Sequence, residues 1–300
     1  MLDMQNSREK KSPYRGLFVT DLDGTLLTDR KNIAVADLHA LQHLRDRGFL
    51  VAIATGRSNY SFNKLIDQLD SSGLNNALAV DYVIVSTGAG LMTFPDSRIV
   101  TSFALSNDDV FCISEYLENY GLDYMIHKPV PDTKRFLYSS HGGDNPDFHN
   151  RLKIYKSYST PFSKSNLQKF GKATEVVCIV PAEEGHVLAD KLMTELSQFS
   201  VIKATSPLDG ESVWIEIFPS NVSKSQTTAF LAERMNIQHQ NICAVGNDFN
   251  DDDLLQWVEH GYLVSNGPSS MKEKLHVVGS NNEGGVCEAI DHWLGSGLFI

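Results

Sequence analysis

Short apolar runs alternate with stretches of helical periodicity along the first part of the chain. Leu38, Leu41 and Leu44 recur at helical spacing and indicate a helix that ends at Gly48, and a second helix is expected over 58–70. The flanking runs are rich in consecutive apolar residues, which is typical of strands covered on both faces of a parallel sheet; they lie at 16–20, 49–57 and 81–90. Alternating β and α units of this kind predict a parallel sheet flanked by helices.

The pattern changes between residues 91 and 209. The segment 141–151 is polar and is expected to be a loop, and helices are expected at 108–119 and 183–198. Shorter strand-like runs lie around them, at 97–105, 122–128, 135–140, 174–180 and 200–205.

The first pattern returns near the end of the chain. Helices are expected to begin at Ser223 and Asp251, and strands are expected at 213–218, 241–246 and 261–266. We therefore predict an α/β fold. Its parallel-sheet core is formed by residues 16–90 and 210–300, residues 91–209 form an inserted α+β domain, and residues 1–15 form a flexible tail.

The balance of charge restricts the partners. The 300 residues carry a formal net charge of −11 and no cluster of Lys and Arg, which argues against nucleic acid or an anionic membrane as a partner. An anionic substrate is also repelled at long range, so phosphate chemistry here would depend on a metal ion and a local lysine.

The apolar content indicates a cytoplasmic protein. The first residues lack the apolar segment of a signal peptide, and no apolar run approaches the length of about 18 residues that a membrane span needs. The four cysteines form no CxxC pair and lie in or beside apolar runs, so we expect buried thiols in a reducing compartment; they are Cys112, Cys178, Cys243 and Cys287.

Two aspartates follow the first strand one residue apart. Alternate residues of a strand point to the same face, so Asp21 and Asp23 are expected to share one small volume. Two carboxylates at a distance of about 4 Å repel each other by about 4 kcal/mol at an effective dielectric constant of about 20. This repulsion predicts a compensating cation beside them.

Other polar residues follow further strands. Ligands bind beyond the carboxyl ends of the strands in open α/β sheets, and the expected strands end at Thr55-Gly56-Arg57, at 86–89 and at 246–251. Lys224 lies in the first turn of the helix that begins near Ser223, and a helix N-terminus together with a lysine offers two donors to an anion. The combination predicts an anion site at one edge of the sheet.

These motifs together resemble those of the haloacid dehalogenase-like phosphohydrolase superfamily, most closely its Cof-type sugar-phosphatase branch. The resemblance rests on the sequence DLDGTLL beginning at Asp21, on Thr55, on Lys224 and on the segment GNDFND at 246–251. It covers residues 16–90 and 210–295. It implies a Rossmann-like core, with the insert at 91–209 where this branch carries a large α/β cap that sets substrate specificity.

The resemblance also implies a mechanism. Asp21 would attack phosphorus and become an aspartyl phosphate, and Asp23 would act as general acid and then as general base. The phosphate would be bound by Thr55, Gly56, Lys224 and Asn250. Mg²⁺ would be held by Asp21, by the backbone carbonyl of Asp23, by Asn247 and by Asp251.

Two positions depart from the pattern of that branch. Asn247 stands where an aspartate that binds the metal is common, which implies a less negative metal site, and Asp248 is the alternative ligand. Thr87 stands where an asparagine is common. The insert also carries polar residues that are either substrate contacts or exposed loop residues, and these are Arg135, Tyr138, His141 and Arg151.

We therefore expect a Mg²⁺-dependent phosphatase that hydrolyses a small phosphorylated metabolite. The preference for sugar phosphates follows from the resemblance alone. Two alternatives stay open: a phosphomutase that uses the same aspartate, and a sensor that binds a phosphorylated ligand with little turnover, which Asn247 would favour.

Overall fold

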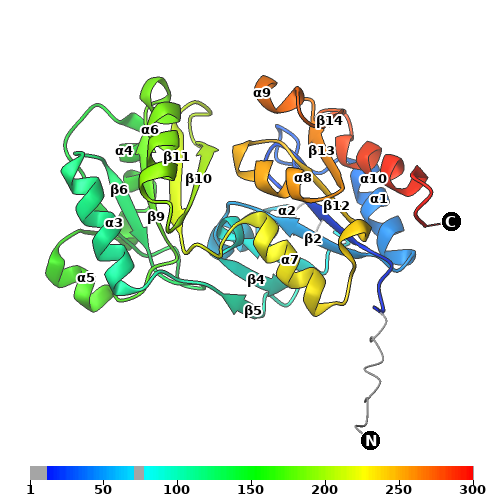
Figure 1. Cartoon of the computed structure of the whole chain (residues 1–300), viewed down its shortest axis with the longest axis horizontal. Coiled ribbons are helices and arrows are strands. Elements are labelled where there is room, and N and C mark those ends of the chain that lie inside the picture. Colours follow the sequence, from blue (N-terminus) through cyan, green and yellow to red (C-terminus); the bar gives the residue numbers. More distant parts are fainter. Residues whose placement is uncertain (1–11, 71–77, 300) are drawn as a thin grey trace, which may run out of the picture.

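Two β-sheets organise the chain, and they lie side by side with their helices in Figure 1. The computed structural model describes residues 12–70 and 78–299. Within these residues one sheet has eight strands in the order β14-β13-β12-β1-β2-β3-β4-β5, and the other has six strands in the order β10-β11-β9-β6-β7-β8. We call the first sheet with its helices the core and the second sheet with its helices the cap.

The core is a doubly covered, mainly parallel sheet. Neighbouring strands from β14 through β3 are parallel, and β4 and β5 continue the sheet in antiparallel pairing. The strands are β1 (Leu17–Thr20), β2 (Leu50–Ala54), β3 (Tyr82–Val85), β4 (Gly90–Thr93), β5 (Ile99–Ser102), β12 (Ile242–Gly246), β13 (His260–Val264) and β14 (His276–Val278). Side chains of β1 and β2 are buried throughout, as the continuous apolar runs predicted.

Helices cover both faces of this sheet because each presents an apolar stripe to it. One face packs against α1 (Val35–Asp46), α2 (Asn59–Asp70) and α10 (Gly285–Gly295). The other face packs against α7 (Lys224–Arg234), α8 (Asp252–Trp257) and α9 (Ser269–Lys272). Short 3₁₀ turns occur at η2 (Ser86–Gly88), η3 (Lys156–Tyr158), η4 (His239–Asn241) and η5 (Phe249–Asp251).

The cap is an α+β unit whose sheet is antiparallel except for the pairing of β7 with β8. Its strands are β6 (Tyr124–His127), β7 (Phe136–Ser139), β8 (Ser159–Pro161), β9 (Glu175–Val180), β10 (Ser200–Thr205) and β11 (Val213–Phe218). One face packs against α3 (Asn107–Asn119), α5 (Lys164–Phe170) and α6 (Ala182–Glu195). On the other face, Phe148 of α4 (Pro146–Ile154) packs against part of the sheet.

The predicted fold class is confirmed, but the borders of the insert are displaced. Strand β4 pairs with β3 and β5 pairs with β4, so residues 90–102 belong to the core sheet, although 91–102 had been assigned to the insert. The strand at 213–218 had been assigned to the core, yet it lies between β9 and β10 of the cap sheet. Apart from Glu216 its residues are apolar, and a central antiparallel strand that is buried on both faces shows the same pattern as a parallel core strand, so the pattern could not distinguish the two sheets.

Smaller expectations also need correction. The segment 141–151 is not all loop, because α4 begins at Pro146 after Asn145 caps it. Of the predicted tail, residues 1–11 lie outside the described residues, and Arg15 donates a hydrogen bond to the backbone carbonyl of Phe299. Cys178 and Cys243 are buried as expected, whereas Cys112 is exposed. Among the described helices, none has both the length and the apolar character required to span a bilayer.

Candidate active site

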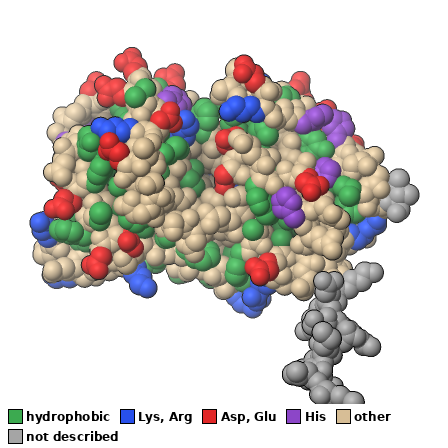
Figure 2. Space-filling view, viewed as in Figure 1, with side chains coloured by type: hydrophobic (Ala, Val, Ile, Leu, Met, Phe, Trp, Pro, Cys, Tyr) green, Lys and Arg blue, Asp and Glu red, His purple; other side chains and the backbone are tan. Residues whose placement is uncertain are grey.

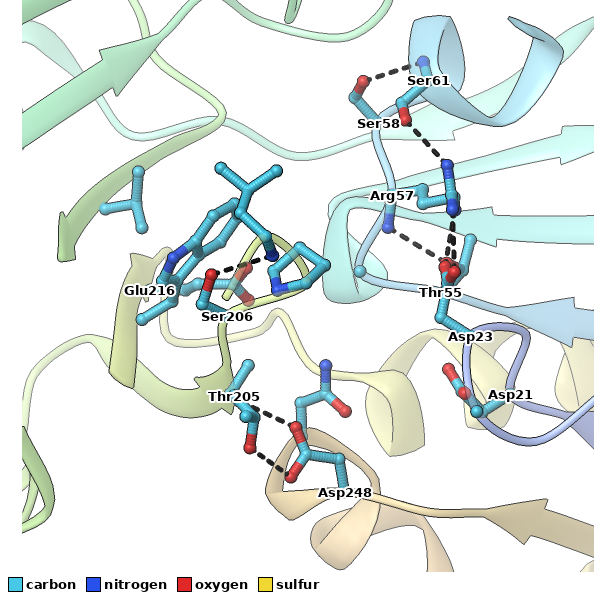
Figure 3. A pocket seen from close by; sticks show the side chains of 18 of the residues that line it. Asp21, Asp23, Thr55, Arg57, Ser58, Ser61, Thr205, Ser206, Glu216 and Asp248 are labelled. Carbon is cyan, nitrogen blue, oxygen red and sulfur yellow. Dashed lines mark hydrogen bonds and ion pairs between the residues drawn. The ribbon is translucent and has the colours of Figure 1, made fainter. Parts of the chain in front are cut away.

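A cavity of about 770 Å³ lies between the core and the cap. The surface is hollowed between the two parts of the molecule in the space-filling view (Figure 2). Figure 3 shows Asp21, Asp23, Thr55 and Arg57 on the core side, opposite Ser206 and Glu216 of the cap. The core residues follow β1 and β2, so the cavity lies at the carboxyl ends of parallel strands, where the sequence predicted it.

A buried lysine joins two aspartates beneath this cavity. Lys224 is fully buried, and its Nζ donates to Asp21 Oδ1 at 2.7 Å and to Asp251 Oδ1 at 2.5 Å. Asp21 lines the cavity although its side chain is nearly buried. The lysine predicted from its position at a helix start is therefore the counter-charge of both carboxylates.

Close backbone packing holds Lys224 in this place. Ser223 caps α7 by accepting a hydrogen bond from the backbone N–H of Gln226. Gly88 has a φ of +114°, and a Cβ there would lie 2.3 Å from the backbone oxygen of Ser223. Thr227 also donates to the Gly88 carbonyl at 2.7 Å. Only glycine allows the start of α7 to approach the turn after β3 this closely.

The three charges alter one another's protonation. Burial lowers the pKa of Lys224, but the negative charges of Asp21 and Asp251 outweigh burial and raise it. Burial and then the charge of Asp251 raise the pKa of Asp21, against the attraction of Lys224. Lys224 is therefore held in its charged form beside a carboxyl whose negative charge needs a partner.

Asp23 is bound by two cations instead. Arg57 donates to it through Nε at 2.5 Å and Nη2 at 2.7 Å, and Lys31 Nζ lies 3.2 Å from the same carboxylate. Burial raises the pKa of Asp23, but the hydrogen bond and charge of Arg57, followed by those of Lys31, outweigh burial and hold it below its usual range. The sequence placed Arg57 at the strand end but gave it no role.

Three oxygen atoms surround the side chain of Asn247. In the amide orientation that satisfies its hydrogen bonds, the Asn247 nitrogen lies 2.9 Å from the Asp23 carbonyl, 3.0 Å from Thr25 Oγ1 and 3.1 Å from Asp21 Oδ2. Gly24 makes room for this approach, since a Cβ there would lie 2.6 Å from the Asn247 amide. Rotation of the amide would direct its own oxygen to the same point. The resulting set of oxygens suits a hard cation such as Mg²⁺.

This set mixes side-chain and backbone oxygen donors, as sites for hard cations often do. Among the described residues, no three His, Cys, Asp or Glu side chains lie close enough together to hold a metal ion. A cation at Asn247 would therefore depend on the Asp23 carbonyl and the amide oxygen as well as on the Asp21 carboxylate. The donors fit the metal, with less negative charge than a set of carboxylates.

The neighbouring acidic residues are already engaged. Asp251 Oδ2 accepts the backbone N–H groups of Asn247 at 2.8 Å and Asp248 at 3.1 Å, while Oδ1 binds Lys224. The Asp248 carboxylate accepts the backbone N–H of Thr205 at 2.8 Å and its hydroxyl at 3.0 Å (Figure 3). Asp248 thus links core to cap, and Asn247 is the residue that faces Asp21.

The predicted phosphate-binding residues converge on the same place. Thr55, Gly56 and Asn250 line the cavity, and Asn250 Oδ1 lies 3.4 Å from Lys224 Nζ. Thr55 Oγ1 accepts the backbone N–H of Arg57 at 3.0 Å. The three residues stand beside Asp21 with hydroxyl, backbone and amide groups that can bind phosphoryl oxygens.

The four residues predicted in the cap separate into two groups. Arg151 lines the cavity, whereas Arg135, Tyr138 and His141 do not. Arg135 approaches Asp132 at 3.6 Å, and His141 approaches Glu118 at 3.4 Å, both away from the cavity. Arg135 and His141 are exposed loop residues, as the alternative predicted, whereas Tyr138 is half-buried in β7.

Two acidic residues of the cap were missed. Glu175 and Glu216 line the cavity from β9 and β11. Each is a single charged residue within or beside an otherwise apolar run, and a charged side chain is rarely buried unless it has a partner. That local signal could have identified both residues.

Comparison with known proteins gives consistent results. The family described as haloacid dehalogenase-like hydrolases matches residues 18–290. The chain is 25% identical to a 5-amino-6-(5-phospho-D-ribitylamino)uracil phosphatase of Bacillus subtilis, over 91% of this chain and 96% of the relative. It is 26% identical to an HMP-PP phosphatase of Yersinia enterocolitica, over 94% of this chain and 96% of the relative.

Solved structures agree with the fold. A phosphatase of the haloalkanoate (HAD) superfamily from Bacteroides thetaiotaomicron matches with a TM-score of 0.72 at 17% identity, covering 95% of this chain and 97% of that one. A HAD subclass IIB sugar phosphatase matches with a TM-score of 0.71 at 16% identity, covering 93% and 98%.

Proposed function

Because the chain belongs to the family of haloacid dehalogenase-like hydrolases, we propose that it is a phosphatase that hydrolyses small phosphorylated metabolites through Asp21. The observation that carries the proposal is the buried Lys224, which binds Asp21 and Asp251 at the base of the cavity. A buried cation that orients a carboxylate toward a cavity prepares that carboxylate to approach an anionic phosphoryl group.

Asp21 is the proposed nucleophile. One of its oxygens forms the bond to phosphorus while the bond from phosphorus to the leaving oxygen breaks, which gives an aspartyl phosphate. Thr55, Gly56 and Asn250 bind the phosphoryl oxygens during this transfer. Water then attacks phosphorus, releases phosphate and restores the Asp21 carboxylate.

Asp23 moves the proton in both steps. It protonates the leaving oxygen in the first step and removes a proton from water in the second. The ion pair with Arg57 keeps Asp23 ionised, which suits the second step. For the first step Asp23 must be protonated, and a bound phosphate that competes for Arg57 would weaken the pair and allow this.

Asp21, the Asp23 carbonyl and Asn247 would hold Mg²⁺, which supplies positive charge against the phosphoryl oxygens when it is bound. Asp251 supports this set indirectly because it fixes the backbone of Asn247 and the position of Lys224. The relatives named as acting on a phosphorylated ribityl compound and as a sugar phosphatase support a small substrate of this kind, with sugar phosphates favoured.

A hydrolysis screen tests the proposal. Release of phosphate is measured for hexose, pentose and triose phosphates, nucleotides and p-nitrophenyl phosphate, with and without Mg²⁺. We expect turnover that requires Mg²⁺ and is lost in Asp21→Asn. Activity retained in Asp21→Asn would contradict the nucleophile. Transfer of phosphate within the substrate without release would indicate a mutase, and binding without turnover would indicate a sensor.

A further inference from the structure

The cap presents polar side chains to the cavity from three adjacent strands. The register pairs His127 of β6 with Glu175 of β9, and it pairs Val177 of β9 with Glu216 of β11. Because alternate residues of a strand share a face, Glu175 and Val177 point the same way as their partners. His127, Glu175 and Glu216 all line the cavity opposite Asp21.

Arg151 of α4 lies against this polar face with most of its donors unused. Its Nη2 lies 3.4 Å from His127 Nε2, and its guanidinium stacks 4.2 Å from the ring centre of Trp214. The Nε atom is buried without a hydrogen-bond partner, and the guanidinium forms no ion pair within the part of the chain that the structure describes. A guanidinium has five N–H donors, so several remain for a ligand.

His127 is fixed as an acceptor toward Arg151. Its Nδ1 lies 2.8 Å from the Thr133 carbonyl and must donate there, which leaves Nε2 without a proton. Burial and then the charge of Arg151 lower the pKa of His127 to about 3, so the ring stays neutral. The imidazole therefore orients Arg151 and adds no charge to the cavity.

The two glutamates have free acceptor atoms. Glu216 Oε2 accepts the Thr87 hydroxyl at 2.7 Å, and the Glu175 carboxyl makes no hydrogen bond or ion pair with another residue that the structure describes. Burial and then the charge of Glu216 raise the pKa of Glu175 to about 8. A carboxyl in this state readily exchanges hydrogen bonds with a hydroxyl group.

We propose that Arg151 and Glu175 form a donor and acceptor pair that binds adjacent hydroxyl groups of an uncharged leaving group, and that the pair selects such esters over those with a second negative charge. This inference rests on the proposed phosphatase function. A diol offers oxygen acceptors to Arg151 and O–H donors to Glu175 at the same time.

The charges near Arg151 favour an uncharged ligand. Burial and then the charge of Glu216 raise the pKa of Glu175 to about 8, and burial raises the pKa of Glu216 to about 7. Near neutral pH the two carboxyl groups together therefore carry no more than about one negative charge, which the positive charge of Arg151 balances. A second phosphate or carboxylate on the leaving group would add a negative charge beside them. A second anion would therefore lose its hydration without a net positive charge from these three groups to compensate it. An ammonium group would instead be repelled by Arg151 while it was attracted to the glutamates.

Matched phosphate esters test this selection. Sorbitol 6-phosphate and 6-phosphogluconate have the same chain length, and the second carries a carboxylate at the far end. Glucose 6-phosphate and glucosamine 6-phosphate differ by an ammonium group, and p-nitrophenyl phosphate lacks aliphatic hydroxyls. We expect kcat/KM on sorbitol 6-phosphate to exceed that on 6-phosphogluconate by about tenfold or more, which corresponds to about 1.4 kcal/mol.

Two variants assign the selection to the pair. In Arg151→Met and in the nearly isosteric Glu175→Gln, kcat/KM on sorbitol 6-phosphate should fall by about tenfold relative to that on p-nitrophenyl phosphate. Above pH 8, where Glu175 is ionised in the wild type, Glu175→Gln should also narrow the ratio of kcat/KM on sorbitol 6-phosphate to kcat/KM on 6-phosphogluconate. The matched controls are Arg98→Met and Glu184→Gln, both at exposed positions outside the cavity, and thermal unfolding checks that each variant is folded.

Several outcomes would overturn the inference. One is a wild-type kcat/KM that is higher on 6-phosphogluconate than on sorbitol 6-phosphate, or higher on glucosamine 6-phosphate than on glucose 6-phosphate. Another is a loss of kcat/KM in both variants that is equal for all esters. Hydrolysis of p-nitrophenyl phosphate without any preference for hydroxyl groups overturns this inference alone. Absence of hydrolysis of every ester overturns the proposed function and this inference with it.

Discussion

Replacing Lys224 by methionine tests whether this lysine is the counter-charge of the site. The substitution keeps the apolar stem but leaves Asp21 and Asp251 buried without the ammonium that lies 2.7 Å and 2.5 Å from them. Breaking a buried pair by removal of one partner costs about 3–5 kcal/mol, because the remaining charge is not compensated. We therefore expect a loss of stability of that size in urea unfolding, together with loss of hydrolysis.

A second substitution separates loss of charge from loss of packing. The double variant Asp21→Asn with Lys224→Met lacks the carboxylate at position 21, so the repulsion between two buried carboxylates is removed. The double variant should be more stable than Lys224→Met alone by about 1 kcal/mol or more. Lys274→Met, at an exposed position, is the control. A Lys224→Met variant that kept the stability of the wild type, or a double variant less stable than Lys224→Met, would refute the reasoning.

Three further predictions concern protons and the metal. Asp23→Asn should reduce hydrolysis of alkyl phosphates more than that of p-nitrophenyl phosphate, because an aryl leaving group needs less protonation; equal losses would contradict the acid role. Asn247→Asp should lower the Mg²⁺ concentration for half-maximal activity and increase the rise in melting temperature on adding Mg²⁺, since it adds a negative ligand; unchanged values in both titrations would exclude Asn247 as a ligand. For Glu175 the pKa of about 8 in the folded protein exceeds the ordinary value of 4.5, so its stabilising effect is complete below pH 4.5 and is lost as the pH rises through 8. The free energy of unfolding of Glu175→Gln minus that of the wild type should therefore rise by about 1–3 kcal/mol as the pH is raised from about 5 to about 8.5. A difference that does not change with pH would show that Glu175 is ionised throughout this range.

The core half of the site was predictable because its signals are local. Asp21, Thr55 and Asn247 each follow an apolar run that forms a parallel strand, and the carboxyl ends of such strands meet at one edge. Lys224 was predicted from the helix start after Ser223. Its contact with Asp251 was not, because that contact depends on how α7 and the loop after β12 pack against each other.

The cap was less predictable because its arrangement depends on distant pairing. The strand at 213–218 has the same apolar pattern that a parallel core strand would have, and only its partners β9 and β10 identify its sheet. The start of α4 was readable, since Asn145 followed by Pro146 is a common helix beginning. Used as a helix signal, it would have predicted that Arg151 lies in a helix and not in a loop.

The two halves of the cavity therefore differ in how the sequence encodes them. The residues proposed for the reaction follow consecutive strand ends, so a single motif carries several of them. The proposed substrate contacts, Arg151 and Glu175, come from α4 and β9 and meet only through the cap sheet and its helix. Substitutions in the cap can change these contacts without moving Asp21 or Lys224. The hydrogen bonds of Thr205 with Asp248 and of Thr87 with Glu216 keep the two halves in contact, so a change of specificity needs no change in the reaction itself.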